Sequence, residues 1–386
     1  MERIARVRDK MRSLRNIRPF VFVFPIVMMS QTLHAQSLRL VREIGQIEGS
    51  ENYTFHRIGG IAVARDGTLF VVDSGDQKVK VYSRTGEFTG SFGRQGSGPG
   101  EFMLPGRIEL RGDTVIVFDV RQSRVIRFTH QGEQLRTESL PSPDGLALAD
   151  FRPMRFGHAV GTSIFRAALG ADTEHDPDLR LLLLRDGSGP VDTLATFQAA
   201  AAIWFDADGQ KSWGVTGTTF GVGVAFALDG DSIIAIADGM TGVVRWFSVQ
   251  ADGLDTLRTA DLGISGSPIT PRDRVELEDS LRARNRTLPR RLGFHLPTMR
   301  SALSGQALFD DRGGLWIELN RAAPLVVTWL RIDGGGQIRR FEIPRQLAIR
   351  AVVSDTIYGV WTGPLDVQTV RVFALELARR TDDHRR

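Results

Sequence analysis

The chain has 386 residues, of which 42% are hydrophobic and 24% are charged, a balance typical of a folded globular protein rather than a disordered or membrane-spanning one. Its net charge is +4, but residues 1–35 hold seven of the 49 Lys/Arg and two of the 45 Asp/Glu, so the remainder carries 42 basic and 43 acidic side chains. A remainder at −1 is not the clustered basic surface that nucleic-acid binding requires, so we expect no nucleic-acid partner. The absence of cysteine excludes disulfides, thiolate metal sites, cysteine nucleophiles and a lipid-modified N-terminal cysteine.

The N-terminal segment has the three parts of a secretory signal peptide. Residues 3–18 are basic, residues 20–29 form an apolar run, and a small-residue cleavage motif ends at Ala35. The apolar run is shorter than the roughly 20 residues that a membrane span needs. We therefore expect residues 1–35 to be a cleaved signal peptide, with no stable transmembrane anchor and an extracytoplasmic location, periplasmic or secreted. Because the basic stretch is long, a start at Met11 is an alternative to Met1.

From residue 58 onward the sequence repeats a unit of short strands separated by turns. The clearest copy is ARDGTLFVVDSGDQKVKVYSRTGEFTGSF at residues 64–92. Its run Leu69–Val72 is apolar on both faces, which predicts a strand packed between neighbouring sheets. The next segment, Lys78–Val81, alternates lysine and valine, which predicts a half-exposed strand.

The alternating strand recurs along the chain, and a Gly- or Asp-containing turn precedes each hydrophobic run. Its copies are RVIRF at 124–128, VVRWF at 243–247, VVTWL at 326–330 and VRVFA at 370–374. These repeats predict an all-β fold, a six-bladed β-propeller. The blades are centred near residues 58–92, 105–140, 147–197, 220–262, 301–343 and 347–377.

The sixth repeat lacks its outer strand, because the chain ends soon after Phe373. The segment Leu38–Ile47, LRLVREIGQI, has strand character but no blade of its own. We expect it to pair as the missing strand and close the ring, which protects edges that would otherwise aggregate. The propeller would then span residues 36–378, followed by a polar tail at 379–386.

The stretch GSFGRQGSGPGEFMLPGRIEL, followed by VIVFDVRQSRVIRF, resembles the inter-blade linker, strand and Asp-containing loop of NHL repeats. The resemblance is sharp over residues 58–130 and diffuse afterwards, and it implies a six-bladed β-propeller. The pattern is broken at Ala199–Gly217 and between blades four and five. Irregular segments on a rigid scaffold are where a function is most readily added.

A helical insertion is predicted between blades four and five, at about residues 270–290. Thr270 suits the N-cap, Pro271 the first helical position, and Asp273 the reciprocal capping position, which predicts a helix up to Arg286. The helix is interpreted either as a solvated element lying on the propeller or as a lid or docking element over the channel mouth.

Three aspartates occupy matching positions after hydrophobic runs, namely Asp73, Asp119 and Asp238. Their repetition favours a structural role in shaping loops over a carboxylate metal site. The histidines are scattered, without close ligand spacing, and no GxSxG nucleophile motif is present. No metal ligands, catalytic residues or cofactors are therefore assigned.

Five arginines lie near the starts of blades, and these are the candidate binding residues. They are Arg57, Arg107, Arg152, Arg300 and Arg345. If the blade starts face one mouth of the channel, their guanidinium groups would form a funnel for carboxylate, phosphate or sulfate. Ordinary solvated surface charge is the alternative interpretation.

The pattern as a whole favours a non-enzymatic binding module, whose loops at one end of the channel hold a protein segment, a glycan or a small anion. One alternative is a hydrolase or lyase similar to exported propeller lactonases, with a divalent cation in the axial channel. Another is an architectural role in an envelope assembly, with the helix as partner contact.

Overall fold

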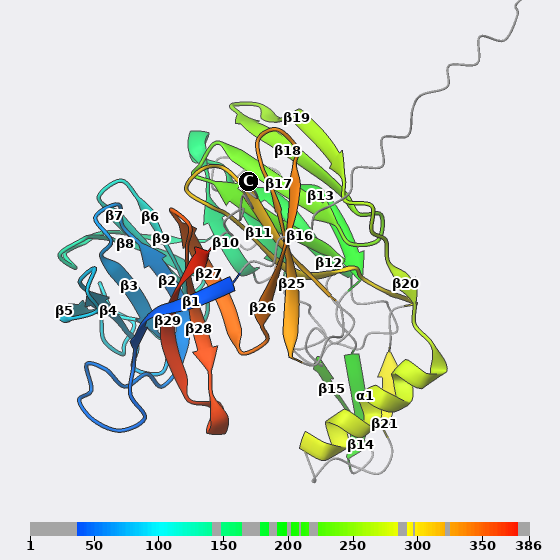
Figure 1. Ribbon diagram of the computed structural model, residues 1–386, viewed down its shortest axis with the longest axis horizontal. Helices are drawn as coiled ribbons and strands as arrows, with labels where there is room; N and C mark the ends of the chain where they lie inside the picture. The colour runs from blue at the N-terminus through cyan, green and yellow to red at the C-terminus, as the bar shows by residue number, and fades with distance from the viewer. Residues whose placement is uncertain are drawn as a thin grey trace, which may run out of the picture. The chain divides into compact units, whose positions relative to one another are not determined.

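The structure is a computed structural model that describes residues 37–140, 148–163, 178–184, 191–198, 202–207, 210–215, 223–284, 292–295, 298–320 and 325–376. Within these residues the strands form six four-stranded antiparallel sheets, shown in Figure 1, so the expected six-bladed β-propeller is confirmed. The segment interpreted as a signal peptide and the polar tail lie outside the described residues.

Each blade is a meander of four strands, numbered here along the chain. Blade one holds β2 (Ile58–Val63), β3 (Leu69–Asp73), β4 (Lys78–Tyr82) and β5 (Phe88–Phe92), and blade two β6 (Pro105–Arg111), β7 (Thr114–Asp119), β8 (Arg124–Thr129) and β9 (Gln134–Ser139). Blade three holds β10 (Leu148–Pro153), β11 (Ala159–Ser163), β12 (Asp178–Leu184) and β13 (Val191–Gln198), and blade four β16 (Val224–Asp229), β17 (Ile233–Asp238), β18 (Val243–Gln250) and β19 (Gly253–Asp261). Blade five holds β23 (Leu303–Phe309), β24 (Leu315–Leu319), β25 (Val326–Ile332) and β26 (Ile338–Pro344), and blade six β27 (Leu347–Val353), β28 (Thr356–Thr362), β29 (Gln368–Glu376) and β1 (Ser37–Ile44).

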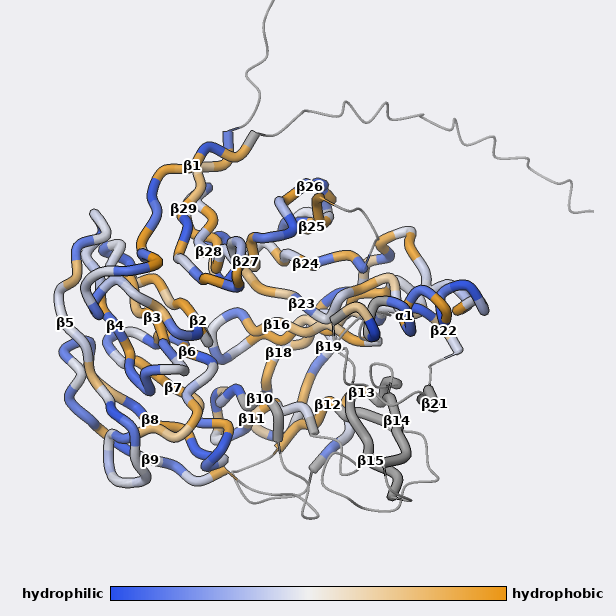
Figure 2. Tube along the Cα trace, turned by 90° about the horizontal axis from the view of Figure 1, so that it is seen from below, coloured by the Kyte–Doolittle hydropathy of each residue, from blue (hydrophilic) through white to orange (hydrophobic). Residues whose placement is uncertain are grey.

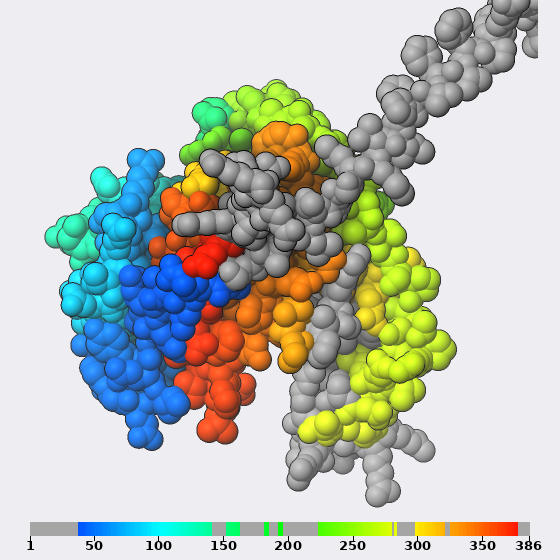
Figure 3. Space-filling model, in the orientation of Figure 1, coloured from blue at the N-terminus to red at the C-terminus, as the bar shows by residue number. Residues whose placement is uncertain are grey.

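The N-terminal strand closes the ring, as the sequence predicts. Strand β1 pairs antiparallel with β29, from Ser37 opposite Glu376 to Ile44 opposite Val370. The blue atoms of this strand lie directly against the red atoms of the last blade in Figure 3. The sixth sheet therefore contains strands from both ends of the propeller sequence, and their pairing closes the ring.

The hydrophobic core consists of six clusters, each shared by two neighbouring blades. One residue from each side of every cluster shows the sequence of contacts around the ring: Phe70 and Val115, Phe118 and Leu184, Val160 and Phe226, Val244 and Ile317, Trp316 and Ile349, Val360 and Ile61. Strand β3 is fully buried, as its two apolar faces predict. Hydrophobicity decreases from the centre of the molecule to its rim, as Figure 2 shows for hydrophobic β16 near the centre and hydrophilic β9 at the rim.

The two irregular regions of the sequence pair with each other. Residues Ala202–Ala207 form β14, which lies between β15 (Gln210–Val215) and β21 (Leu292–His295) in a three-stranded sheet. A two-stranded sheet joins β20 (Ser267–Pro268) to β22 (Met299–Arg300). The break in blade three and the insertion after blade four are thus one structural unit.

Helix α1 (Pro271–Arg284) confirms the predicted helical insertion. Its N-terminus has the expected reciprocal cap, because the Thr270 amide donates to Asp273 Oδ2 at 2.7 Å and the Asp273 amide donates to Thr270 Oγ1 at 3.3 Å. Within the part of the chain that the structure describes, no helix combines the length and apolar character needed to cross a bilayer.

Candidate functional site

The loops that follow the second strands define one end of the propeller, which we name the Asp-loop face after Asp73, Asp119 and Asp238. Each carboxylate accepts hydrogen bonds from backbone amides. The donors are Arg57 and Gly75 for Asp73, Met103 and Leu104 for Asp119, and Met240 and Thr241 for Asp238, at 2.7–3.3 Å. The carboxylates of Asp73 and Asp119 reach back to the amides that open their own blades, so the predicted structural role of the repeated aspartate is confirmed.

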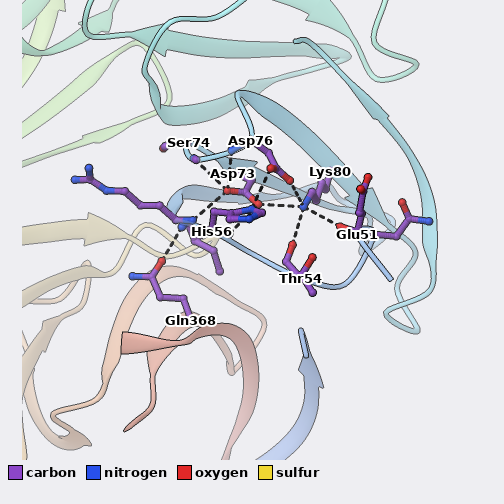
Figure 4. Close-up of polar contacts among 12 residues, drawn as sticks. Glu51, Thr54, His56, Asp73, Ser74, Asp76, Lys80 and Gln368 are labelled. Atoms are coloured by element: carbon purple, nitrogen blue, oxygen red, sulfur yellow. Dashed lines mark hydrogen bonds and ion pairs between the residues drawn. The ribbon is translucent and has the colours of Figure 1, made fainter. Parts of the chain in front are cut away.

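Lys80 is buried beneath this face, where the sequence predicts a half-exposed strand, and that prediction is wrong at this position. Its side chain is only 4% exposed, and its ammonium lies 3.0 Å from Asp73 Oδ2 and 2.8 Å from Asp76 Oδ2 (Figure 4). It also donates to the backbone carbonyls of Thr54 at 2.7 Å and Glu51 at 3.0 Å. Two carboxylates and two carbonyls replace the water that a buried ammonium loses, which is why burial is tolerated.

These residues form what we name the seam cluster, comprising Thr54, Asp73, Asp76 and Lys80. Residues 51–57 connect the closing strand to blade one, so the Lys80 bonds to their carbonyls fix that connection. Burial alone raises the pKa of the Asp76 carboxyl, but the hydrogen bond and charge of Lys80 outweigh it and hold the pKa below its usual range. The seam cluster therefore secures the closure of the ring.

A carboxylate and histidine group also lies here, because atoms of His56, Asp73 and Asp76 come within 4.8 Å of one another. His56 Nδ1 is 3.0 Å from Asp76 Oδ1. The Lys80 ammonium, however, already bridges the two carboxylates and supplies their counter-charge. A divalent cation at this point would face a buried positive charge, so the arrangement is that of an ion-pair network rather than a metal centre.

Three of the five candidate arginines have different local surroundings in the structure. Arg300 forms an ion pair with Asp273 at the start of α1. Arg152 is buried and its guanidinium stacks on the Phe226 ring, 4.1 Å from the ring centroid. Arg57 is exposed beside the seam cluster. Two of these three guanidinium groups have partners of their own, so a single funnel of all five arginines stays a prediction.

The other two candidate arginines, Arg107 and Arg345, belong to a charged group with Arg350, which the sequence analysis does not single out. Arg350 lies in β27, where its charge interacts with those of Arg107 and Glu318, and Glu318 in turn interacts with Arg345. We name Arg107, Arg345, Arg350 and Glu318 the axial basic cluster. The signal in the sequence is a lone arginine in the otherwise apolar first strand of blade six, LAIRAVV.

Three innermost strands at the axial basic cluster contain bulges. The strand register shifts around Arg107 in β6, around Arg350 in β27 and around Ser304 in β23. A bulge re-aims the side chain of its extra residue and is common beside functional sites. A bulge depends on how two strands pair, so the sequence alone does not indicate that Arg350 belongs to this cluster.

Strand β2 lies between the strands that carry these two arginines and has glycines where it meets β6. A Cβ atom added at Gly60 would lie 2.9 Å from the carbonyl oxygen of Gly106, closer than side chains tolerate. Strand β27 contacts β2 from the other side. The missing side chain allows the first strands to approach closely and brings Arg107 and Arg350 within electrostatic range.

Burial sets the electrostatics of the axial basic cluster. It raises the pKa of the Glu318 carboxyl, against the opposing effects of a hydrogen bond with Ser304 and the charges of Arg345 and Arg350. Burial also lowers the pKa of the Arg350 guanidinium, and the like charge of Arg107 adds to this. Glu109, 3.5 Å from Arg107, offsets part of the Arg107 charge, and Glu318 offsets part of the Arg350 charge.

Arg350 also has an unmet hydrogen-bonding requirement. Its Nε atom is buried and has no hydrogen-bond partner among the described residues. A buried donor without a partner is costly, of order 1–3 kcal/mol. An acceptor atom of a bound anion would satisfy both this donor and the excess charge.

Comparison with known proteins agrees with the fold. A family model described as a 6-bladed beta-propeller, DUF5128, matches residues 27–147, which is less than half of the chain. This stretch includes the closing strand and the two blades in which the repeat is sharpest. No match was found among curated proteins.

Several solved structures are similar over most of their length. A Bacteroides fragilis protein provisionally named as exported has 12% identity and a TM-score of 0.49, covering 89% of this chain and 97% of its own. A DUF4221 member from Bacteroides vulgatus has 9% identity and a TM-score of 0.49, covering 89% and 99%. Virginiamycin B lyase from Staphylococcus aureus has 11% identity and a TM-score of 0.41, covering 88% and 100%. Likeness at this level carries no argument about activity.

Proposed function

We propose that the protein is an extracytoplasmic binding module that holds a small anion at the axial basic cluster. The observation that carries the proposal is Arg350, a guanidinium on the innermost strand of a bulged blade whose buried Nε has no partner among the described residues. The signal-like N-terminal segment supports a location outside the cytoplasm.

The expected ligand is a carboxylate, phosphate or sulfate group. Guanidinium groups present paired donors that match the oxygen atoms of these anions, and such charge-assisted bonds are about twice as strong as neutral ones. Burial reduces the competition from water and strengthens the attraction. Glu318 limits affinity, because its carboxylate competes for the guanidinium of Arg350.

The alternative of a metal-dependent hydrolase or lyase receives no support from the residues described. The one acidic group with suitable ligand spacing in the described ranges is the His56, Asp73 and Asp76 group, and Lys80 neutralises it.

Calorimetric titration tests the proposal. Sulfate, phosphate and malonate are titrated into the purified protein, into Arg350→Gln and into Arg339→Gln as control. Arg339 is an exposed arginine of the outer strand β26 whose guanidinium donates to Gln337 Oε1 at 3.3 Å, so its loss should leave binding unchanged. Loss of Arg350 should weaken binding by about tenfold or more, the value of a charge-assisted hydrogen bond. Equal isotherms for Arg350→Gln and the unmodified protein would refute the assignment.

A further inference from the structure

A cavity of about 440 Å³ lies between blades three and four, apart from the axial basic cluster. Its walls come from β13, β16, β17, β18 and the start of β22, and they share no residue with the anion site proposed above. A volume of this order is within the range of pockets that hold small organic molecules.

The helical insertion builds one wall of this cavity. Pro268 pairs with Met299 in the two-stranded sheet, and the Gly266 amide donates to the Met240 carbonyl at 2.9 Å. Both methionines line the cavity. The Gly239 amide donates to the Gly223 carbonyl at 2.7 Å, which fixes the loop that carries Met240. The cavity is thus formed where the regular blade meets the irregular unit.

Most of the cavity lining is apolar, with Ile236, Met240, Phe247 and Met299 as its largest members. Methionine side chains are flexible and polarisable, so they adapt to ligands of varied shape. A purely polar ligand would leave this surface without partners. The body of the ligand should therefore be apolar.

Two charged residues line the cavity, and only one of them is available. Asp238 is occupied by its own loop, because it accepts hydrogen bonds from the Met240 amide at 2.8 Å and the Thr241 hydroxyl at 2.8 Å. The exposed side chain of Arg245 has no hydrogen bond or ion pair with any residue in the described ranges, and it lines the same space. A cation beside an apolar cavity without an acceptor of its own favours a ligand with one anionic group.

We propose that this cavity binds an amphipathic carboxylate, with its apolar body against Met240, Met299 and Phe247 and its carboxylate on Arg245. Medium-chain fatty acids and aryl carboxylates belong to this chemical class. The site is independent of the axial basic cluster, so each can be tested without the other.

The probe is decanoate, with decanol and decyltrimethylammonium as matched ligands that replace the anionic group by a neutral or a cationic one. Calorimetry should show binding of decanoate, at least tenfold weaker binding of decanol, and no binding of the cation. Equal affinity for decanoate and decanol would overturn the role of Arg245.

Variants of the protein locate the site. Arg245→Gln should weaken decanoate binding by about tenfold or more, Arg245→Lys should restore part of it, and Arg339→Gln should have no effect. Met299→Trp should abolish binding by filling the cavity, with an unchanged thermal midpoint of unfolding showing that the fold is intact. Should Met299→Trp fail to fold, the comparison of Arg245→Gln with Arg245→Lys decides the question alone.

Cross-titration separates this site from the axial one. Sulfate binding should be unchanged in Arg245→Gln, and decanoate binding should be unchanged in Arg350→Gln. Decanoate binding that is lost in Arg350→Gln and kept in Arg245→Gln would place the carboxylate at the axial basic cluster and overturn the proposal.

Discussion

Two interfaces of the same ring differ in whether their charged side chain has hydrogen-bond partners. At the seam between the closing strand and blade one, Lys80 is buried and each of its hydrogen bonds goes to a carboxylate or a carbonyl. Between blades three and four, Arg245 lines a cavity and has no such partner in the described ranges. The first interface follows the regular repeat of the sequence, and the second adjoins the irregular segments of blade three and of the insertion after blade four. The contrast separates an interface that closes the ring from one where we propose binding.

The sharpest test of this contrast is Lys80→Met, for which we expect the largest effect. Removing one partner of a buried ion pair leaves uncompensated carboxylates, at a cost of about 3–5 kcal/mol. Lys78→Met, two residues earlier on the same strand, is the control and should cost far less, because the Lys78 side chain is only partly buried. Chemical denaturation measures the free energy of unfolding of both variants.

The pH dependence of the free energy of unfolding of Lys80→Met shows whether charge or packing keeps Lys80 buried. The seam holds the pKa of Asp76 below its ordinary 3.8, so the stability that this carboxylate contributes is present above that pH and is lost as the pH falls through the lowered pKa. Without Lys80 this contribution disappears, and the two proteins should converge in strong acid. A difference that stays constant with pH would show that packing, not charge, keeps Lys80 in place.

The contrast also shows what the sequence could and could not reveal. Hydrophobic periodicity and turn residues are local signals, so the six blades and the closing strand were predictable. The alternation of Lys78 and Lys80 gave no sign that Lys80 is buried, because two of its four acceptors are carbonyls in a loop that is distant in the sequence, at Glu51 and Thr54. The bulge that directs Arg350 and the pairing of β14 with β21 are likewise tertiary features.

The next largest loss of stability is expected where the first strands of blades one and two, β2 and β6, approach closely. Gly60→Ala places a methyl group 2.9 Å from the Gly106 carbonyl and should destabilise the protein by about 1–3 kcal/mol. Gly90→Ala is the matched control in the outer strand of the same blade, where an added Cβ has no atom within 4 Å. It should be neutral or slightly stabilising, because alanine reduces the entropy of the unfolded chain. Sulfate affinity should fall in Gly60→Ala alone, and equal behaviour of the two variants would contradict the packing argument.

A smaller change, in sulfate affinity, is expected from the protonation of Glu318. Its pKa is raised above the ordinary 4.5, so the carboxylate gains a proton as the pH falls towards that raised value and stops competing for Arg350. Sulfate remains a dianion over this range, so its affinity should increase on acidification by up to about tenfold. In Glu318→Gln the affinity should be high and independent of pH. A pH dependence that persists in this variant would assign the titration to another group.

The smallest change in stability is expected from breaking an ion pair in the insertion that forms the cavity wall. The ion pair between Arg300 and Asp273 joins the start of α1 to β22, and both side chains are partly exposed, at 25% and 18%. Arg300→Gln should therefore lower global stability by less than about 1 kcal/mol. Amide hydrogen exchange should nevertheless become faster in α1, because the helix loses a link to the blades while the core stays intact. Unchanged exchange in α1, together with unchanged decanoate affinity, would mean that the cavity wall is held by the pairing of Pro268 with Met299 and does not depend on the helix.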